Sequence, residues 1–299
     1  MKPTLTILTP IYNRANLLPQ VFACLQKQTD MDFEWIIIND GSTDNSLAVA
    51  QGFKTDSFNI QVLNKPNGGK HTALNYAHQY IHGKYVLILD SDDSLTAHAV
   101  GSIKIEWKKY QHNTKIGMLI FLRGDNKLTP FCIVTQYNRP VDFITCKRTH
   151  ILGRDCCEVI RTDLFKQFSF PEFPGEKFVS ESALWNRLSQ DYQCVYINKI
   201  IYICKYLCDG LTQAGISMRI KNPRGGMYVA NTELTPKNSL KKRLKYGILY
   251  TCYGKFAGYT FRQLKEYCSN KIIFYLTYLG GILLYWYWKN KFISQENDD

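Results

Sequence analysis

Four short apolar runs, separated by segments with helical spacing, constrain the fold of this chain more than any other feature. The runs cover residues 5–8, 33–38, 60–63 and 85–89. Continuous apolar runs of this length are typical of strands that are buried on both faces of a sheet. The intervening apolar residues favour helices over 17–25, 44–50 and 70–81. Repeated β-α-β units predict an α/β fold with a mainly parallel sheet, right-handed crossovers and flanking helices.

Three of these predicted strands are followed at once by polar residues. The three clusters are Thr9-Pro10, Asn39-Asp40-Gly41 and Asp90-Ser91-Asp92-Asp93. Open parallel sheets bind their ligands at the carboxyl ends of the strands, so a carboxylate-rich site is expected there. Asp90 and Asp92 suit a Mg²⁺ or Mn²⁺ ion that bridges to a diphosphate, because these cations prefer oxygen ligands. Aspartates also favour helix N-termini, and this segment alone fits both roles equally well.

The rest of the chain is less regular. Ser94 or Thr96 is expected to cap a helix that reaches about Tyr110. Beyond it we expect short strands at 118–122, 131–135 and 158–160. A further helix is expected to begin near Ser180-Glu181, because apolar residues then recur at helical spacing.

Four segments of the first hundred residues form an ordered set. They are Leu8-Thr9-Pro10-Ile11-Tyr12-Asn13-Arg14, Ile38-Asn39-Asp40-Gly41-Ser42-Thr43-Asp44, Asn67-Gly68-Gly69-Lys70 through Asn75, and Leu89-Asp90-Ser91-Asp92-Asp93. In this order and spacing they resemble the family 2 glycosyltransferases, which have the Rossmann-like GT-A fold. Residues 176–188 extend the resemblance, and Asp209-Gly210-Leu211 is a weaker continuation.

The resemblance implies a nucleotide-sugar site at the first two strands. Pro10, Tyr12 and Arg14 match the segment that lines the nucleotide pocket, and Asp40 matches the carboxylate that contacts the nucleoside. Asn39 departs from the pattern, because many members carry an acid there. An amide can still hydrogen-bond a uracil edge, so Asn39 stays among the expected nucleotide contacts.

A cation for the donor phosphates is also implied. The family often carries an Arg where this chain has Leu74, and Lys70 or His71 is expected to supply that charge instead. We favour Lys70, because its permanent charge suits phosphate. His71 and His78 are interpreted as ordinary residues on the surface of the predicted helix.

The metal and the base follow from the same resemblance. Asp90 matches the acid near the ribose and metal-bound water, Asp92 matches the direct metal ligand, and Asp93 is expected to cap a helix. Glu181 matches the general base that takes the proton of the acceptor hydroxyl. The leaving diphosphate needs no protein acid, because the metal neutralises its charge. One base and one metal site therefore suffice for a single displacement with inversion.

Alternatives to Glu181 remain open. Glu176 and Glu158 are weaker candidates for the base, and Glu181 also suits a helix N-terminus for electrostatic reasons alone. The Gln-x-x-Arg-Trp motif of the processive polymer synthases is missing from the sequence. The resemblance therefore implies transfer of one hexosyl or N-acetylhexosaminyl unit per binding event, from a UDP-linked donor to a glycan or lipid-linked acceptor in cell-surface polysaccharide synthesis.

Residues 236–299 are basic and aromatic, and we expect them to form a helical tail outside a catalytic domain over 1–235. That domain is expected to comprise a nucleotide-sugar half over 1–115 and an acceptor-side half over 116–235. The tail supplies eleven Lys or Arg against four acids, within a net charge of +12 for the chain. Residues 272–288 carry no charge, and Gly280-Gly281 is expected to interrupt them. This segment is expected to lie in an anionic membrane interface, with a short span, a re-entrant hairpin or a packed soluble helix as alternatives.

The expected location is the cytoplasm, on the inner face of the cell membrane. The N-terminus enters a strand pattern without a signal-peptide segment, and ten scattered cysteines form no CxxC pair. A sugar nucleotidyltransferase is one alternative, although the first strand lacks a Gly-rich phosphate loop. A non-catalytic nucleic-acid binder is another, but the mouth of the predicted sheet is acidic, so no nucleic-acid partner is expected.

Overall fold

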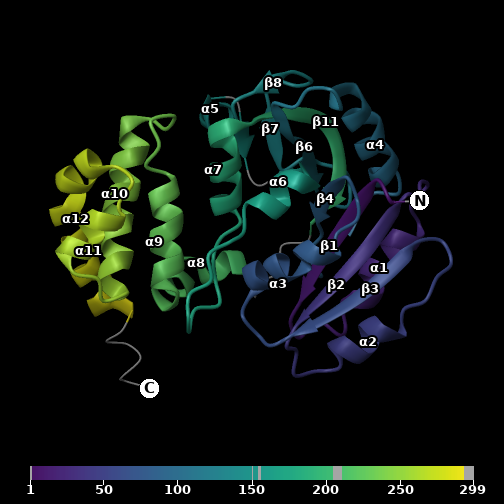
Figure 1. The fold of residues 1–299 in the computed structure, drawn as a ribbon, viewed down its shortest axis with the longest axis horizontal. Coiled ribbons are helices and arrows are strands. Elements are labelled where there is room, and N and C mark those ends of the chain that lie inside the picture. The colour runs from purple at the N-terminus through teal and green to yellow at the C-terminus, as the bar shows by residue number, and fades with distance from the viewer. Residues whose placement is uncertain (1, 150, 154–155, 205–210, 293–299) are drawn as a thin grey trace. The chain divides into compact units, whose positions relative to one another are not determined.

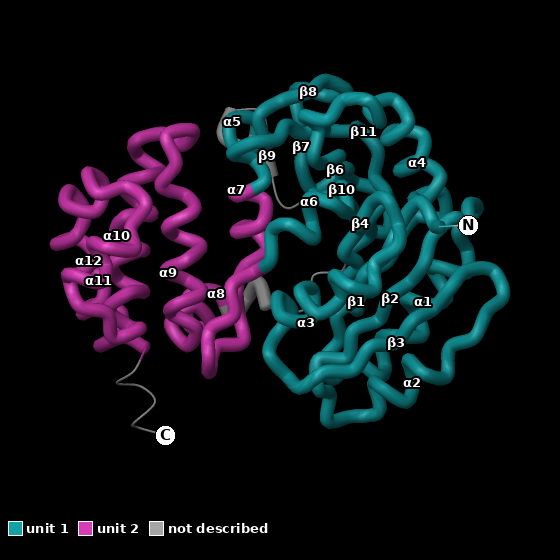
Figure 2. The backbone as a smooth tube through the Cα atoms, viewed as in Figure 1, with its two compact units in different colours: residues 1–169, 188–206 teal, residues 170–187, 207–299 magenta. Residues whose placement is uncertain are grey.

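A computed structural model describes residues 2–149, 151–153, 156–204 and 211–292. The chain divides into two compact units (Figure 2). Unit 1 comprises residues 1–169 and 188–206, and unit 2 comprises residues 170–187 and 207–299. The boundary that the sequence suggested after residue 235 lies inside unit 2, so the expected catalytic domain and tail do not coincide with the two units.

Unit 1 is built on one mixed sheet (Figure 1). In the described residues its strands run in the order β3-β2-β1-β4-β10-β6-β11-β5, with β8 also beside β11. The strands are β1 Leu5–Ile11, β2 Phe33–Asp40, β3 Asn59–Lys65, β4 Tyr85–Ile88, β5 Ser94–Leu95, β6 Ile116–Gly124, β8 Pro140–Val141, β10 Cys157–Arg161 and β11 Gln193–Ile203. A separate two-stranded sheet pairs β7 Cys132–Val134 with β9 Ile151–Gly153.

Helices connect the strands of this sheet. They are α1 Leu18–Gln26, α2 Ser46–Gly52, α3 Lys70–Ala77, α4 Ala99–Tyr110, α5 Phe143–Thr149 and α6 Thr162–Gln167, with a 3₁₀ turn at His78–Tyr80. Strands β3, β2, β1 and β4 are mutually parallel, as the alternation of apolar runs predicted. Strand β10 is antiparallel to β4 and β6, and β11 is parallel to β6. The α/β fold with a mainly parallel first half is therefore confirmed.

Two local predictions in unit 1 are wrong. Ser94 does not cap a helix, because Ser94–Leu95 form strand β5 against β11, and α4 begins only at Ala99 after His98. Pairing with a distant strand overrides the local capping preference of a serine. His71 is buried rather than on the helix surface, and His78 is half-buried with its ring edge-on to Phe165 at 5.0 Å.

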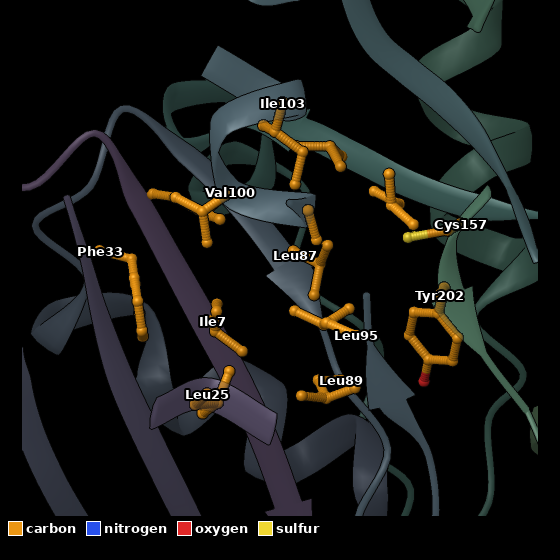
Figure 3. Close-up of a cluster of buried hydrophobic side chains, with 14 of the residues drawn as sticks. Ile7, Leu25, Phe33, Leu87, Leu89, Leu95, Val100, Ile103, Cys157 and Tyr202 are labelled. Carbon is orange, nitrogen blue, oxygen red and sulfur yellow. The ribbon is translucent and has the colours of Figure 1, made fainter. Parts of the chain in front are cut away.

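The main apolar core of unit 1 joins the sheet to its helices. Side chains of β1, β4, β10 and β11 converge in it, including Ile7, Leu87, Cys157 and Tyr202 (Figure 3). Strand β2 is buried along its whole length, as expected for a central strand covered on both faces. This packing fixes the strand ends, and with them the polar residues that follow.

Unit 2 is helical in its described residues. Its helices are α8 Leu211–Lys221, α9 Pro223–Thr232, α10 Leu240–Phe256, α11 Phe261–Tyr267 and α12 Lys271–Phe292, and α7 Ser182–Asp191 begins in it. Its core includes Tyr250, Tyr253, Phe274 and Trp288. None of the described helices combines the length and the apolar character needed to cross a membrane.

The expected interruption at Gly280-Gly281 is wrong, because α12 is continuous through both glycines. Gly281 instead allows close approach of α12 to α10. A Cβ atom on Gly281 would lie 2.4 Å from Cβ of Thr251, and one on Gly247 would lie 2.5 Å from Oγ1 of Thr277. Small residues here permit the two helices to pack backbone to backbone.

Candidate active site

The carboxyl ends of the first four strands meet at one edge of the sheet. Asn39 pairs in register with Asn64, and Asp40 with Lys65, where β2 and β3 end. Strand β4 joins the same edge, since the amide of Leu89 donates to the carbonyl oxygen of Leu8 at 2.8 Å. The polar residues that the sequence placed after these strands therefore lie along a common edge. A surface hollow lined by residues 31–34 and 58–59 lies at the other edge, where β2 and β3 begin, and is no part of this site.

Asp40 organises the loop after β3. Its buried carboxylate accepts hydrogen bonds from Nζ of Lys65 at 2.6 Å and from the backbone amides of Gly68 and Gly69 at 2.9 and 2.7 Å. The side-chain amide of Asn67 donates to the same carboxylate at 3.1 Å. These four bonds occupy the carboxylate from within the protein. Asp40 thus shapes the 67–69 loop, and its predicted contact with the nucleoside stays a prediction.

Gly41 is required where this loop meets β2. Its φ of +67° lies in the left-handed region, and a Cβ atom there would stand 2.6 Å from the backbone nitrogen of Asn67. Asn39 is held beside it, since its amide donates to Asn64 at 2.8 Å and accepts from the backbone of Ser42 at 3.3 Å. Glycine is needed at position 41 because the backbone of the 67–69 loop approaches it too closely for a Cβ atom.

The segment after β1 is fixed through its backbone. Asn13 has a φ of +53° and its side-chain oxygen accepts from the amide of Thr43 at 2.8 Å. The amide of Arg14 donates to Oγ of Ser46 at 2.7 Å. Tyr12, which precedes them, is 46% exposed. Of the predicted nucleotide-pocket residues, Pro10 therefore lies in β1, while Tyr12 and Arg14 lie on the ordered turn after it, where Tyr12 is exposed.

Asp90 lies at the end of β4 and forms an ion pair with Lys70 at the start of α3. Both side chains are 30% exposed. Burial would raise the pKa of the Asp90 carboxyl, but the positive charges of Lys70 and Arg123 outweigh it and hold that pKa below its ordinary value. The preference for Lys70 over His71 as the cation of this site agrees with this pairing.

Two residues of this site were missed by the sequence analysis. The hydroxyl of Tyr202, on β11, accepts a hydrogen bond from the backbone amide of Asp90 at 2.9 Å. The guanidinium of Arg123, on β6, stacks over the Tyr202 ring at 4.3 Å from its centroid. Arg123 keeps its charge despite burial, because Tyr202, Asp90 and other acidic groups raise its pKa well above the ordinary value. No local motif marks either residue, since the pairing of β6 with β11 brings them to Asp90.

Three carboxylates crowd the turn after β4. Burial, together with the charges of Asp90 and Asp92, raises the pKa of Asp93 to about 6. Asp93 also hydrogen-bonds Tyr202 and does not cap α4, which begins at Ala99, so the predicted capping role is wrong. A divalent cation would relieve the repulsion among these three carboxylates, and carboxylate oxygens are ligands that such a cation prefers. The residues present therefore fit such an ion. Among the described residues, no three acidic, His or Cys side chains are arranged to hold a metal by themselves.

The candidate bases fall into different surroundings. Glu181 belongs to unit 2, immediately before α7, and its carbonyl oxygen accepts from the amide of Leu184 at 2.9 Å. The carboxylate of Glu176 caps α9, accepting from the amides of Arg224 and Gly225 at 2.8 Å each. Glu158 lies on β10, and its charge raises the pKa of Arg123. Glu176 therefore has a structural task, while the role of Glu181 stays a prediction. Asp209 and Gly210 lie outside the described residues.

An α/β sheet that ends in a carboxylate cluster beside fixed cations is the arrangement of the GT-A glycosyltransferases, which use nucleotide sugars. Residues 6–145 match the family model described as glycosyl transferase family 2. This match confirms the resemblance and, together with the curated relatives, supports a glycosyltransferase over a nucleotidyltransferase or a nucleic-acid binder.

Curated relatives agree with this assignment. Chondroitin synthase of Pasteurella multocida is 40% identical over 98 residues, which are 33% of this chain and 10% of that protein. The chain thus spans only about a tenth of the length of this relative. A GalNAc(5)-diNAcBac-PP-undecaprenol β-1,3-glucosyltransferase of Campylobacter jejuni is 25% identical over 279 residues, covering 89% of this chain and 85% of that protein.

Solved structures share the fold. TarS of Staphylococcus aureus, residues 1–349 with UDP-GlcNAc, aligns over 93% of this chain and 79% of its own at 16% identity, with a TM-score of 0.63. The mannosyltransferase PcManGT of Pyrobaculum calidifontis, with GDP-Man and Mn²⁺, aligns over 98% and 88% at 15% identity, with a TM-score of 0.55. These likenesses confirm the GT-A fold.

Proposed function

We propose that this glycosyltransferase moves one sugar from a nucleotide-diphosphate sugar to a hydroxyl of a glycan or lipid-linked acceptor, with inversion and with a divalent metal. The observation that carries the proposal is the crowding of Asp90, Asp92 and Asp93 at the end of β4, beside Lys70 and Arg123. Anionic and cationic groups side by side suit a metal together with a diphosphate.

Asp90 and Asp92 would hold the metal, either Mg²⁺ or Mn²⁺, and the ion would neutralise charge on the leaving diphosphate. Lys70 would then turn from Asp90 toward a phosphate oxygen, to which it is a permanent donor. The Mn²⁺ bound by the mannosyltransferase of the same fold supports divalent metal use. Tyr202 would keep the Asp90 turn in place, because its hydroxyl accepts a hydrogen bond from the Asp90 amide. Arg123 would support Tyr202 by stacking over its ring.

The donor is a UDP-linked sugar in this proposal, with a hexosyl or N-acetylhexosaminyl group. The UDP-GlcNAc bound by TarS supports it. Asn39 can offer an amide to uracil, although it already pairs with Asn64. Pro10, Tyr12 and Arg14 would line the nucleotide pocket, and the loop that Asp40 holds would form its other side.

Glu181 is the proposed base. Single displacement requires one carboxylate that can take the acceptor proton, and Glu176 is already engaged at the N-terminus of α9. The aspartates of the β4 turn are assigned to the metal. Glu181 stands immediately before α7, and its place in the 176–188 segment matches the base that the family resemblance implies.

The acceptor is proposed to be a glycan or a lipid-linked glycan at the inner face of the cell membrane, in cell-surface polysaccharide synthesis. The Campylobacter jejuni relative is named for an undecaprenol-linked acceptor, and it aligns along most of this chain. The basic character of residues 237–292 supports an anionic membrane surface as partner rather than nucleic acid, because the mouth of the sheet is acidic.

A donor screen tests this function. The full chain is incubated with UDP-, GDP- and dTDP-linked sugars in Mn²⁺, and released nucleotide and sugar are followed by NMR. We expect slow hydrolysis of one UDP-sugar, with the opposite anomer released first, and its loss in excess EDTA. Turnover that is unchanged in EDTA would overturn the metal-dependent mechanism, and release of the retained anomer would overturn inversion.

A further inference from the structure

One face of α12 is apolar and uncovered. Seven large side chains on this helix are each between 53% and 76% exposed. They are Ile272, Tyr275, Leu276, Leu279, Leu283, Trp286 and Tyr287, and we refer to them as the outer face of α12. So many exposed large apolar side chains on one element are unusual for a protein surface and mark a contact site.

The exposed and buried residues of α12 separate cleanly around its axis. At 3.6 residues per turn the outer face spans an arc of about 120°. Ile273, Phe274, Thr277, Gly281 and Trp288, which are buried, lie on the opposite side. That opposite side packs on α10 (Figure 1), and Gly247 and Gly281 allow the two helices to approach closely. The apolar residues of α12 therefore serve two purposes, and only the inner ones are needed for folding.

Positive charge surrounds the outer face. Helix α12 carries Lys271, Lys289 and Lys291 and no acid, and residues 237–292 carry eleven Lys or Arg against the single acid Glu266. Nζ of Lys289 lies 5.2 Å from the ring centroid of Trp286. Nζ of Lys265 lies 5.6 Å from that of Tyr275. Lysines beside tyrosine and tryptophan, with leucines between, form the side-chain pattern of helices in a membrane interface.

We propose that the outer face of α12 binds the surface of an anionic lipid bilayer, with the helix lying in the interface plane. The inference deepens the proposed function, because it rests on a lipid-linked acceptor and names the surface that would bring the enzyme to it. The charge favours a bilayer over a second copy of the chain. Anionic headgroups attract the lysines beside the outer face, whereas a second copy would set like charges against them. From Ile272 to Tyr287 the outer face is about 24 Å long.

The test must spare the core of unit 2. Removing residues 270–299 would delete Ile273 and Phe274 from that core, so a truncated chain would report on folding as well as on lipid binding. The outer-face variant is therefore Leu279→Ser with Leu283→Ser, at 76% and 71% exposure. The matched control is Ile105→Ser with Ile133→Ser, two apolar residues of unit 1 that are each 60% exposed.

The experiment is flotation of the full chain with phosphatidylcholine vesicles, with and without phosphatidylglycerol. We expect binding to the anionic vesicles, only partly reversed by high salt, because burial of apolar groups is not screened. The outer-face variant should bind roughly tenfold or more weakly, and the control variant should bind as wild type. Brominated lipid should quench the fluorescence of wild type more than that of Trp286→Phe.

Donor turnover and light scattering separate the possible outcomes. Donor turnover without any vesicle binding would overturn this surface and leave the proposed function standing. Vesicle binding without donor turnover would support the surface and remove the proposed function. A wild-type dimer that the outer-face variant dissociates, with no binding to vesicles, would overturn the lipid partner in favour of a second copy.

Discussion

Unit 1 and unit 2 present different kinds of surface to their ligands. At the carboxyl edge of the unit 1 sheet, the candidate site consists of charged groups that other residues hold by hydrogen bonds, as Asp40 and Asp90 are held. On α12 of unit 2, the exposed side chains are apolar, and only the opposite side of the helix packs in the core of the unit. Fixed polar groups suit a small charged donor that must be placed with accuracy. An apolar helix face suits a broad surface that requires no fixed register.

Two of the ion pairs of unit 1, Lys65–Asp40 and Lys70–Asp90, give the largest expected effect. Lys65→Met leaves the carboxylate of Asp40, 4% exposed, without its cation, and we expect a loss of about 3–5 kcal/mol in the free energy of unfolding. Lys70→Met breaks a pair that is 30% exposed on both sides and should cost less than about 1 kcal/mol. Urea titration of both variants measures this. Equal losses of unfolding free energy in the two variants would mean that the greater burial of the Lys65–Asp40 pair does not increase its contribution to stability.

The two glutamates near α7 differ in role. Glu181→Gln should keep donor affinity and lose transfer by at least ~100-fold, the low end for removal of a general base. Glu176→Gln should keep transfer and lose about 1 kcal/mol of stability, since it weakens the cap of α9. Transfer assays, donor calorimetry and thermal unfolding distinguish these outcomes. If the effects were exchanged, Glu176 would be the base.

Neighbouring glycines of α12 test the packing of unit 2. Gly281→Ala places a Cβ atom 2.4 Å from Thr251 and should destabilise the protein by about 1–3 kcal/mol. Gly280→Ala meets Ile248 only at 3.4 Å, and should be neutral or stabilising by up to about 1 kcal/mol, because alanine favours helices. Thermal unfolding of the two variants checks this difference. A stable Gly281→Ala variant would mean that α10 and α12 do not pack closely.

His78 should give the smallest effect, and one confined to unit 1. Burial, together with the charge of Lys166, lowers the pKa of His78 to about 4. A histidine with a depressed pKa binds its proton mainly in the unfolded chain, so stability should fall as the pH drops from about 6.5 toward 4. At pH 5.5 the loss is about 1 kcal/mol, and His78→Gln should remove it. Unfolding at pH 7.5 and 5.5 measures the difference, and an equal pH dependence in both proteins would contradict it.

The sequence predicted the first half of unit 1 well, because its signals are local. A continuous apolar run indicates a buried strand. Asp40, Asp90 and Asp92 come shortly after such runs in the sequence. Strand β11 was missed, because its sequence mixes polar and apolar residues and only pairing with β6 makes it a strand. Tyr202 and Arg123 were missed with it. Contacts between residues so far apart in the chain leave no pattern within a local window.

Unit 2 shows the opposite difficulty. The aromatic and apolar composition of residues 272–288 was evident, but it could not assign each residue to the core or to the outer face. That assignment depends on the position of α10, which Gly247 and Gly281 allow to approach. Gly280-Gly281 was interpreted as a break in the helix, since glycine has a low helix propensity, but the close packing of α12 on α10 outweighs that cost.

The carboxylate cluster after β4 is the centre of this account, and binding of UDP to the full chain tests it most directly. Calorimetry with wild type should show UDP affinity about tenfold or more higher in Mn²⁺ than in EDTA, because an ion held by Asp92 would supply positive charge for the diphosphate. Asp92→Asn should bind UDP with the same low affinity in both buffers while unfolding at the temperature of wild type. Equal affinity of wild type in Mn²⁺ and EDTA, or metal-enhanced binding by Asp92→Asn, would contradict the metal site proposed for this glycosyltransferase.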